Sequence, residues 1–403
     1  MNWKLIRIID TYLGIPLLLA LSLARRFGRH PASPSVGVKR ILLIKFWGIG
    51  NIFMIIPSIL ALRKAYPDAI LDFLTLESNR QALEISGAAD TIVTIDTGTI
   101  PRFISTWQRA VSRLKHNDYD IIVDFEQFAR FSALVANQVG AREIIGFATR
   151  GQHRSYLYTH AIPYDNTIHI TRSFFALSTA AGTANIPFPT EISLPGIEGL
   201  QKRGREILAE SGIGADEVCV VMHVGTSDNF RERRWLPERY AALADLLTSR
   251  FQVRVIFTGL AEESFLIREV FRHLRAQEAV ADLSGRLQFD DYFALVAATD
   301  LVISADTAAV HLASALDIPV VGLYGPNTPT LYGPWGSNGI AVYPQFDCSP
   351  CITNFNAKLH TCRHPAGRGA CMRAIEVEDV FTAIQQHYFS PTAPCRLKKL
   401  GGD

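Results

Sequence analysis

Short apolar runs alternate with longer amphipathic stretches from Lys39 onward. Uninterrupted apolar runs are typical of strands buried on both faces of a parallel sheet. In the first half they are RILLIKF (40–46), AILDFLTL (69–76), TIVTID (91–96), YDIIVDF (119–125) and EIIGF (143–147). IFMIIPSILALRKAYP (52–67) predicts a helix that ends at Pro67.

The same alternation restarts in the second half of the chain. Predicted strands are VCVVMHVG (218–225), VRVIFTG (253–259), DLVISAD (300–306) and IPVVGLYG (318–325), with helices over 235–250 and about 307–316. NIPFPTEISLPGIEG (185–199) is rich in Pro and Gly, lacks helical periodicity, and predicts an interdomain linker. We therefore expect an α/β protein of two doubly wound domains, 36–195 and 196–390, whose ligand loops face a cleft, followed by a tail, 391–403.

The first 35 residues differ from the rest. TYLGIPLLLALSLA (11–24) is uncharged and is flanked by basic residues: Lys4, Arg7, Arg25, Arg26 and Arg29. Fourteen residues are fewer than the roughly 20 needed to cross a bilayer, and Gly14 and Pro16 interrupt the run. This pattern favours a membrane-associating helical segment at an anionic surface. A cleaved signal peptide and a helix packed on the protein's own body are the alternatives.

Composition limits the classes of partner. The chain has 403 residues, 48% of them apolar, which suffices for two large cores. Its formal net charge is only +2, so it lacks the basic footprint of a nucleic-acid-binding protein. We expect no nucleic-acid partner.

The strand ending at Ser304 is followed by Asp306 and Thr307 at the start of a helix that carries His311. The N-terminus of a helix suits a diphosphate, and Asp306 suits sugar hydroxyls. Alternatively, Asp306 is only an N-cap. The next strand ends in a turn at Gly325 and Pro326 that would face the same ligand.

Two further loops follow predicted strands. After 218–225 come Thr226 and Ser227 and then the cations Arg231, Arg233 and Arg234, which suit phosphate oxygens unless they form a solvated charge run. After Gly259, either Glu262 or Glu263 could accept both hydroxyls of a ribose. Carboxylates are also common in the first turn of helices for other reasons.

Together these motifs resemble glycosyltransferase family 9, the ADP-heptose:lipopolysaccharide heptosyltransferases, over roughly residues 39–385. The order and spacing of the segments make the resemblance specific. The matching segments are Gly48-Ile49-Gly50-Asn51, Arg233-Arg234-Trp235, Gly259 to Glu263, Asp306-Thr307 with His311, and Gly325-Pro326-Asn327-Thr328. The resemblance implies GT-B architecture, with an acceptor domain followed by a nucleotide-sugar domain, and inverting, metal-independent transfer.

By this resemblance, Arg233 replaces a lysine that contacts the donor diphosphate, and Glu263 holds the nucleotide ribose. Asp306 contacts the transferred sugar, and the backbone of Thr307 and Ala308 contacts the phosphates. The other donor-side candidates are Gly50, Thr226, Ser227, His311, Gly325 and Pro326.

The largest departure from the family pattern is Asn51, where the resemblance places an aspartate as general base. A positioned base typically contributes 10²–10⁴-fold to a proton transfer, and an amide cannot accept the proton. Glu126, beyond the strand 119–125, is the preferred substitute. Asp124 is equally well explained as a structural cap, and Asp96 is a weaker option.

Four of the six cysteines, Cys348, Cys351, Cys362 and Cys371, lie close together in the sequence, near His360 and His364. The first pair has the Cys-x₂-Cys spacing of zinc ligands. Structural zinc, one or two disulfides and reduced packing thiols all remain open, and a cytoplasmic site favours reduced thiols.

These observations predict a membrane-associated glycosyltransferase at the cytoplasmic face of the inner membrane. It would need no cofactor and would move a sugar from a donor such as ADP-heptose to a lipid-linked glycan or lipopolysaccharide-core acceptor. Three alternatives remain. They are the same fold with another nucleotide-sugar donor, a non-catalytic nucleotide-sugar-binding protein that lost its base, and a nucleotide-sugar 2-epimerase.

Overall fold

The computed structural model describes residues 37–189, 192, 194–226, 228–352, 362–395, 397 and 399, together with Tyr12, Gly14, Pro16, Leu18 and Leu21. Most of the predicted membrane-associating segment 1–35 lies outside the described residues, as do Ser227 and His360. The chain forms two compact units, Met1–Pro189 and Thr190–Asp403. Among the described residues, no helix has both the length and the apolarity needed to cross a bilayer.

The first unit is built on a parallel six-stranded sheet of order β3-β2-β1-β4-β5-β6. Its strands are β1 (Arg40–Ile44), β2 (Ile70–Leu76), β3 (Thr91–Ile95), β4 (Tyr119–Asp124), β5 (Ala141–Ala148) and β6 (His160–Pro163). Its helices are α3 (Ile49–Ala65), α4 (Arg80–Ser86), α5 (Ile100–Lys115), α6 (Arg130–Val139) and α7 (Ile170–Ser178), with short turns η1 (Glu77–Asn79), η2 (Arg154–Leu157) and η3 (Thr179–Thr183).

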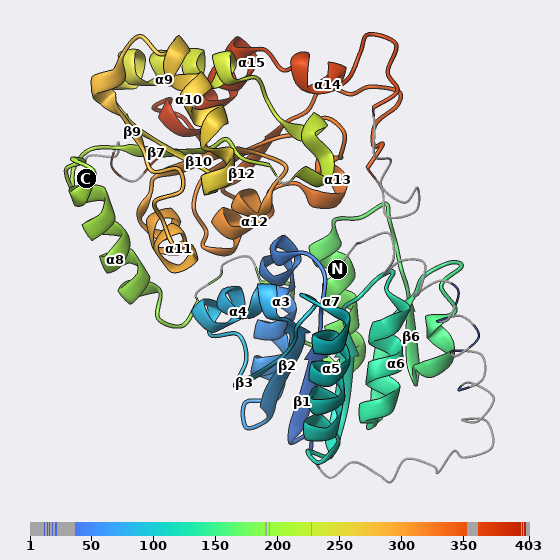
Figure 1. Ribbon diagram of the computed structural model, residues 1–403. Coiled ribbons are helices and arrows are strands. Elements are labelled where there is room, and N and C mark those ends of the chain that lie inside the picture. Colours follow the sequence, from blue (N-terminus) through green and yellow to red (C-terminus); the bar gives the residue numbers. More distant parts are fainter. Residues whose placement is uncertain are drawn as a thin grey trace. The chain divides into compact units, whose positions relative to one another are not determined.

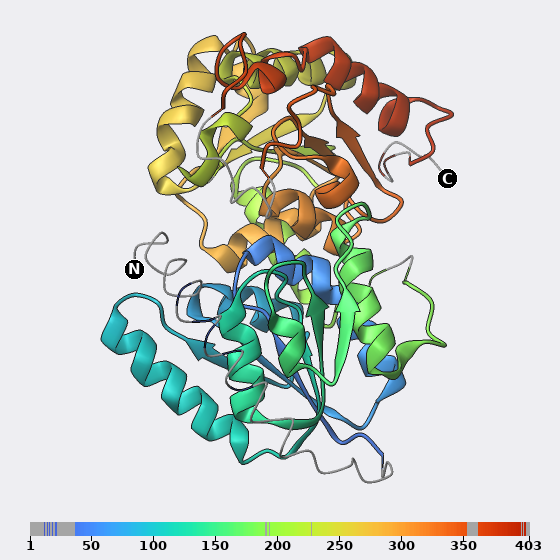
Figure 2. The same cartoon turned by 90° about the vertical axis from the view of Figure 1, so that its right-hand side faces the viewer.

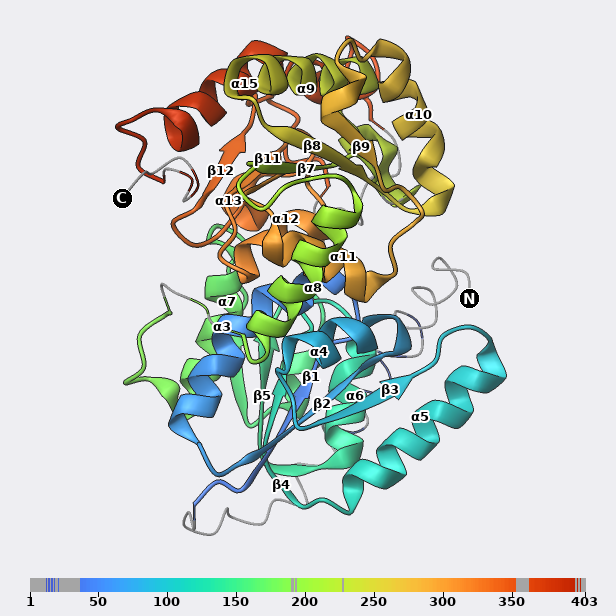
Figure 3. The same ribbon diagram turned by 90° about the vertical axis from the view of Figure 1, so that its left-hand side faces the viewer.

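Helices cover both faces of this sheet. α3 packs beside α7 on one face, and α5 packs beside α6 on the other (Figures 1 and 3). Residues Ile41 to Ile44 of β1 are fully buried, as a central strand between two helical layers requires. The apolar run at 40–46 therefore reflects burial on both faces.

The second unit repeats the design with the order β12-β11-β10-β7-β8-β9. Its strands are β7 (Cys219–His223), β8 (Arg254–Thr258), β9 (Val280–Asp282), β10 (Leu301–Ala305), β11 (Val320–Leu323) and β12 (Gly339–Val342). Its helices are α8 (Ile197–Glu210), α9 (Pro237–Phe251), α10 (Ser264–His273), α11 (Phe289–Ala298), α12 (Ala308–Ala315), α13 (Pro329–Tyr332), α14 (Ala370–Arg373) and α15 (Val377–Ile384), with short turns η4 (Asp228–Arg233), η5 (Ala261–Glu263), η6 (Gln277–Ala279) and η7 (Gln385–Phe389).

In this unit α9 packs against α10 and α15, and α8 packs against α11 (Figures 1 and 2). Counted from its own first strand, the second sheet has the same order as the first. In both sheets the order reverses beside the first strand, between β1 and β4 and between β7 and β10. Open α/β sheets bind ligands at the carboxyl ends of the strands at such switch points. The residues that follow these four strands are therefore the candidates for function.

Every strand predicted above is present, and β6, β9 and β12 are additional edge strands that the apolar pattern did not indicate. Edge strands bury less surface, so their sequences carry a weaker signal. α3 begins at Ile49 instead of residue 52, which places Asn51 inside its first turn. It ends at Ala65, two residues before Pro67.

Candidate functional site

The turn after β1 brings Asn51 to the switch point of the first sheet. Gly48 has φ 87°, a left-handed conformation that glycine adopts readily. α3 starts directly after it, so Gly50 and Asn51 lie in the first helical turn. A Cβ at position 48 would lie 2.6 Å from Asn51 Nδ2. Gly48 thus permits both the turn and the close approach of the Asn51 amide.

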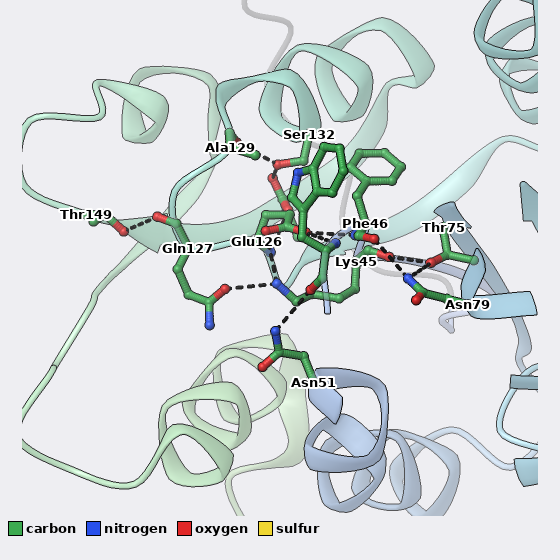
Figure 4. A network of polar contacts seen from close by, with 12 residues as sticks. Lys45, Phe46, Asn51, Thr75, Asn79, Glu126, Gln127, Ala129, Ser132 and Thr149 are labelled. Carbon is green, nitrogen blue, oxygen red and sulfur yellow. Dashed lines mark hydrogen bonds and ion pairs between the residues drawn. The ribbon is translucent and has the colours of Figure 1, made fainter. Parts of the chain in front are cut away.

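Glu126 joins the loop after β4 to this turn. Its Oε1 accepts hydrogen bonds from the N–H groups of Phe46 and Trp47, both at 2.8 Å, and its Oε2 lies 2.9 Å from Lys45 Nζ (Figure 4). Lys45 Nζ also donates to Gln127 Oε1 at 2.9 Å. The Lys45 and Glu126 side chains are 1% and 3% exposed, so they form a buried ion pair. Burial lowers the pKa of the Lys45 ammonium, and the Glu126 carboxylate opposes part of this shift.

Asp124 supports the backbone of the same loop. Its Oδ1 accepts the N–H of Glu126 at 3.0 Å, and its Oδ2 accepts from Ser132 Oγ, Arg154 Nη2 and Tyr158 OH at 2.7–2.8 Å. Arg154 also donates to the carbonyl oxygen of Glu126. Asp124 and Arg154 are both 0% exposed. A carboxylate with four donors and no exposure is a structural anchor, which agrees with the cap alternative for Asp124.

Asn51 has a defined amide orientation. Its Nδ2 donates to the carbonyl oxygen of Trp47 at 3.0 Å (Figure 4). This leaves the amide oxygen as the atom that can accept a hydrogen bond from a ligand. As an amide, the Asn51 side chain can make hydrogen bonds but cannot take a proton.

The remaining carboxylate candidate, Asp96, follows β3 and lies outside this network. Its Oδ1 accepts the N–H of Gly98 at 2.7 Å, and its Oδ2 is 3.8 Å from Arg102 Nη1. Because β3 is the edge strand of the sheet, Asp96 is two strands away from the switch point.

In the second unit, Arg233 at the end of η4 lies beside Asp306, which directly follows β10. Arg233 Nη1 donates to the carbonyl oxygen of Asp306 at 2.8 Å and is 3.7 Å from its Oδ2. Asn327 Nδ2 donates to the same Oδ2 at 3.0 Å. Asp306 is 7% exposed and lies near the buried Tyr324, whose pKa is raised well above its usual value by burial and by the Asp306 charge. This site combines a cation with a positioned carboxylate.

The neighbouring loops contribute Thr226 and Glu263. Arg234 Nε donates to Thr226 Oγ1 at 3.1 Å, and Arg234 Nη2 donates to the Thr226 carbonyl oxygen at 3.2 Å. Glu263 is buried, whereas Glu262 is exposed, so Glu263 is the better of the two candidates. Its Oε2 accepts the N–H of Leu260 at 2.9 Å. A Cβ at Gly225 would collide with the Glu263 carboxylate, so only glycine permits this approach.

Thr307 caps α12. Its Oγ1 accepts the N–H of Ala309 at 3.2 Å and contacts Ser304 Oγ at 2.9 Å. The alternative that Asp306 is the N-cap is therefore wrong, and its carboxylate serves the contacts given above. Ala308 opens the helix, and His311 lies one turn further on at 5% exposure.

The turn after β11 joins this site to the cysteine cluster. The carbonyl oxygen of Pro326 accepts the N–H of Cys351 at 2.8 Å, and a Cβ at Gly325 would lie 2.8 Å from Cys371 Sγ. A cavity of about 10 Å³ is lined by these residues together with Cys348, Cys362, Glu232 and His364.

All six cysteines are free thiols, which excludes the disulfide alternative in this structure. Burial raises the pKa of Cys351 to about 11 and also raises that of Cys371. No group of three or more His, Cys, Asp or Glu side chains within the described ranges is arranged to hold a metal ion.

The sequence did not indicate every residue of these networks. Among those it missed are Lys45, which lies inside an apolar strand run, Arg154, and Asn327, which the sequence placed only as part of a turn. Lys45 carries a usable signal, because a lone cation in a buried run requires a partner. The sequence around Arg154 and Asn327 contains no comparable signal.

The chain is similar to known proteins in both sequence and fold. The family model described as glycosyltransferase family 9 (heptosyltransferase) matches residues 107–360. Lipopolysaccharide heptosyltransferase 1 of Pseudomonas aeruginosa is 26% identical over 329 residues, which cover 78% of this chain and 86% of the relative.

Two solved structures are similar to this chain. A glycosyltransferase family 9 protein of Veillonella parvula has a TM-score of 0.71 and 20% identity, covering 88% of this chain and 98% of that one. An Escherichia coli heptosyltransferase solved with ADP-2-deoxy-2-fluoro heptose has a TM-score of 0.63 and 19% identity. The match covers 86% of this chain and 99% of that one. These matches confirm the predicted fold class of two Rossmann-like domains.

Proposed function

Because the chain belongs to glycosyltransferase family 9, the heptosyltransferases, we propose that it transfers heptose from ADP-heptose to a lipopolysaccharide-core or lipid-linked glycan acceptor, with inversion and without a metal ion. The observation that carries this proposal is the Arg233–Asp306–Asn327 arrangement at the switch point of the second sheet. The ADP-heptose analogue bound by the Escherichia coli heptosyltransferase supports the choice of donor.

The second unit would bind the donor. Arg233 would neutralise the diphosphate as it leaves, together with the N–H groups at the start of α12, which are those of Thr307 and Ala308. Asp306, fixed by Asn327, would accept hydrogen bonds from hydroxyls of the transferred sugar. Glu263 would accept hydrogen bonds from the ribose. Thr226, Ser227, His311, Gly325 and Pro326 would complete the donor site.

The first unit would bind the acceptor near Asn51, with the buried Glu126 and Asp124 behind the same turn. The acceptor oxygen attacks the anomeric carbon, the bond from that carbon to the diphosphate breaks on the opposite face, and the hydroxyl proton passes to solvent water. Asn51 would align the attacking hydroxyl through its amide oxygen. Because Asn51 departs from the family pattern, the principal alternative is the same fold with a different nucleotide-sugar donor.

The test is donor turnover. Detergent-purified protein is incubated with ADP-heptose and other nucleotide sugars, with and without an extract of lipopolysaccharide precursors, and the released nucleoside diphosphate is measured. We expect release with ADP-heptose that depends on the extract. Release with another donor would replace heptose in the proposal. Donor binding without release under any condition would identify a protein that binds nucleotide sugars without catalysis.

We also propose that the protein works at the cytoplasmic face of the inner membrane. On α5, Arg102, Arg109 and Arg113 recur at spacings of seven and four residues, so they form one exposed row, and the helix carries no acidic residue. The triple change of these arginines to Gln should lower binding to phosphatidylglycerol vesicles about 10²-fold, at roughly fivefold per charge. Flotation of the full-length protein measures this binding.

The matched control removes three exposed arginines from the second unit, as Arg268→Gln, Arg272→Gln and Arg275→Gln on and just after α10. It changes the net charge equally and should leave vesicle binding within about twofold, because surface charge acts locally over a Debye length. Equal losses in both triples would assign binding to net charge. Unchanged binding in both would assign it to other parts of the chain.

A further inference from the structure

Glu126 is the preferred general base on sequence grounds, but its surroundings point to another role. We propose that Glu126, paired with Lys45, is a positioning residue: it fixes the turn 45–48 and thereby sets the orientation in which Asn51 meets the acceptor. This inference rests on the proposed function.

Both oxygens of the Glu126 carboxylate are engaged by donors within the protein, at three of about four acceptor positions. Oε1 accepts two backbone N–H groups, from Phe46 and Trp47, and Oε2 accepts from the Lys45 ammonium. The side chain is 3% exposed. Taking a proton would cancel the charge that compensates buried Lys45 and would weaken three hydrogen bonds at once. A base needs an accessible oxygen, and Glu126 lacks one.

The same contacts connect Glu126 to Asn51 through one residue. The N–H of Trp47 donates to Glu126, and the carbonyl oxygen of Trp47 accepts the Asn51 amide. Both peptide groups of Trp47 are thus fixed, one by Glu126 and one by Asn51. In Figure 4 the Asn51 amide nitrogen points toward this network and its oxygen points away from it. If the turn moved, the Asn51 oxygen would move with it.

A second layer keeps Glu126 itself in place. Its N–H donates to Asp124, and its carbonyl oxygen accepts from Arg154. Thr75 Oγ1 donates to the carbonyl oxygen of Lys45 at 2.6 Å, and Asn79 Nδ2 donates to that of Phe46 at 2.8 Å (Figure 4). The turn is therefore held on both sides by buried polar groups, a degree of support typical of residues that position a reacting group.

The experiment is a charge-removal cycle with Glu126→Gln, Lys45→Met and the double variant. Each single change leaves one buried charge without its partner, so each should lower the Tm by several degrees and raise the acceptor KM at least about fivefold. The double change removes both charges, while the amide oxygen of the substituted side chain can still accept from the two backbone N–H groups. It should restore most of the lost Tm and bring kcat/KM to within about threefold of the wild type, with an unchanged pH profile.

The base hypothesis predicts a different result. If Glu126 takes the proton, the double variant stays as inactive as Glu126→Gln, at about 10²–10⁴-fold below the wild type, and the acidic limb of the pH profile is lost. That outcome would overturn the proposal.

Coupling to Asn51 is measured separately. If Glu126 acts through Asn51, the KM effect of Glu126→Gln should disappear in an Asn51→Ala background, because the two changes then remove the same interaction. Fully additive effects would contradict the proposal. The control pair is Arg63 and Asp90, a half-exposed ion pair of the same unit at 2.9 Å. Arg63→Met and Asp90→Asn should leave the acceptor KM unchanged.

Failure of the proposed function gives a separate result. If the wild type shows no transfer with any donor, the function is wrong, and the Tm cycle still reports whether Lys45 and Glu126 depend on each other. If the wild type is active and the double variant shows no rescue of Tm or activity, the positioning role is wrong and the function stands.

Discussion

Replacing Arg233 with alanine is expected to lower kcat/KM for the nucleotide sugar about 10²–10³-fold, the usual cost of removing a positioned group that stabilises transition-state charge. Arg233 is the cation held against Asp306, at 2.8 Å from its carbonyl oxygen. Negative charge grows on the diphosphate as the sugar leaves, so the loss should fall mainly on kcat. Steady-state release of nucleoside diphosphate, with donor and acceptor varied in turn, measures both constants.

Arg233→Lys is the informative companion, because the resemblance places a lysine at this position. It should retain activity within about tenfold of the wild type, since the charge remains while the planar fork is lost. Arg250→Ala, in the last turn of α9, is the control and should leave both constants unchanged. Equal activity of Arg233→Ala and the wild type would remove Arg233 from the donor site.

The second large effect concerns stability. Arg154→Met should lower the free energy of unfolding of the first unit by about 3–5 kcal/mol, the range for breaking a buried ion pair from one side. Arg154 and Asp124 are both 0% exposed, with Nη2 and Oδ2 2.8 Å apart, and the change would leave the Asp124 carboxylate buried without a cation. Urea unfolding followed by circular dichroism and limited proteolysis of the unit measures the loss.

The comparison is Arg63→Met, which removes an ion pair whose side chains are 34% and 45% exposed. Such pairs contribute about 0–1 kcal/mol, so its unfolding curve should nearly overlay that of the wild type. Overlapping curves for Arg154→Met and Arg63→Met would show that the buried network adds no stability.

The two candidate sites differ in how far the sequence predicted them. Asp306 and Thr307 stand directly between β10 and α12, and Glu263 stands just after β8. Each of these residues follows a buried strand that ends in a turn. This pattern involves only neighbouring residues, so the sequence alone predicts their positions. The sequence could not distinguish Glu263 from Glu262, because both side chains occupy the first turn after the same strand. The difference in their burial, which only the structure shows, favours Glu263.

Glu126 shows the opposite case. Its position after β4 was predictable from the sequence, but its partners were not. Glu126 contacts Lys45, which is 81 residues away in the sequence, and Phe46, which is 80 residues away. β1 and β4 are neighbours only because the chain crosses over after β3. Glu126 is a plausible base when only the sequence is considered, but in the fold it is the buried partner of Lys45.

The sequence by itself determined the two runs of alternating strands and helices, the strand ends that carry Asn51, Thr226 and Asp306, and the resemblance to the family. These features depend on neighbouring residues, and hydrophobic periodicity records them directly. Only the tertiary structure decided which polar side chains are partners, because strand order and burial set the distances between them. The pairing of Lys45 with Glu126 and of Asp124 with Arg154, and the amide orientation of Asn51, belong to that second class.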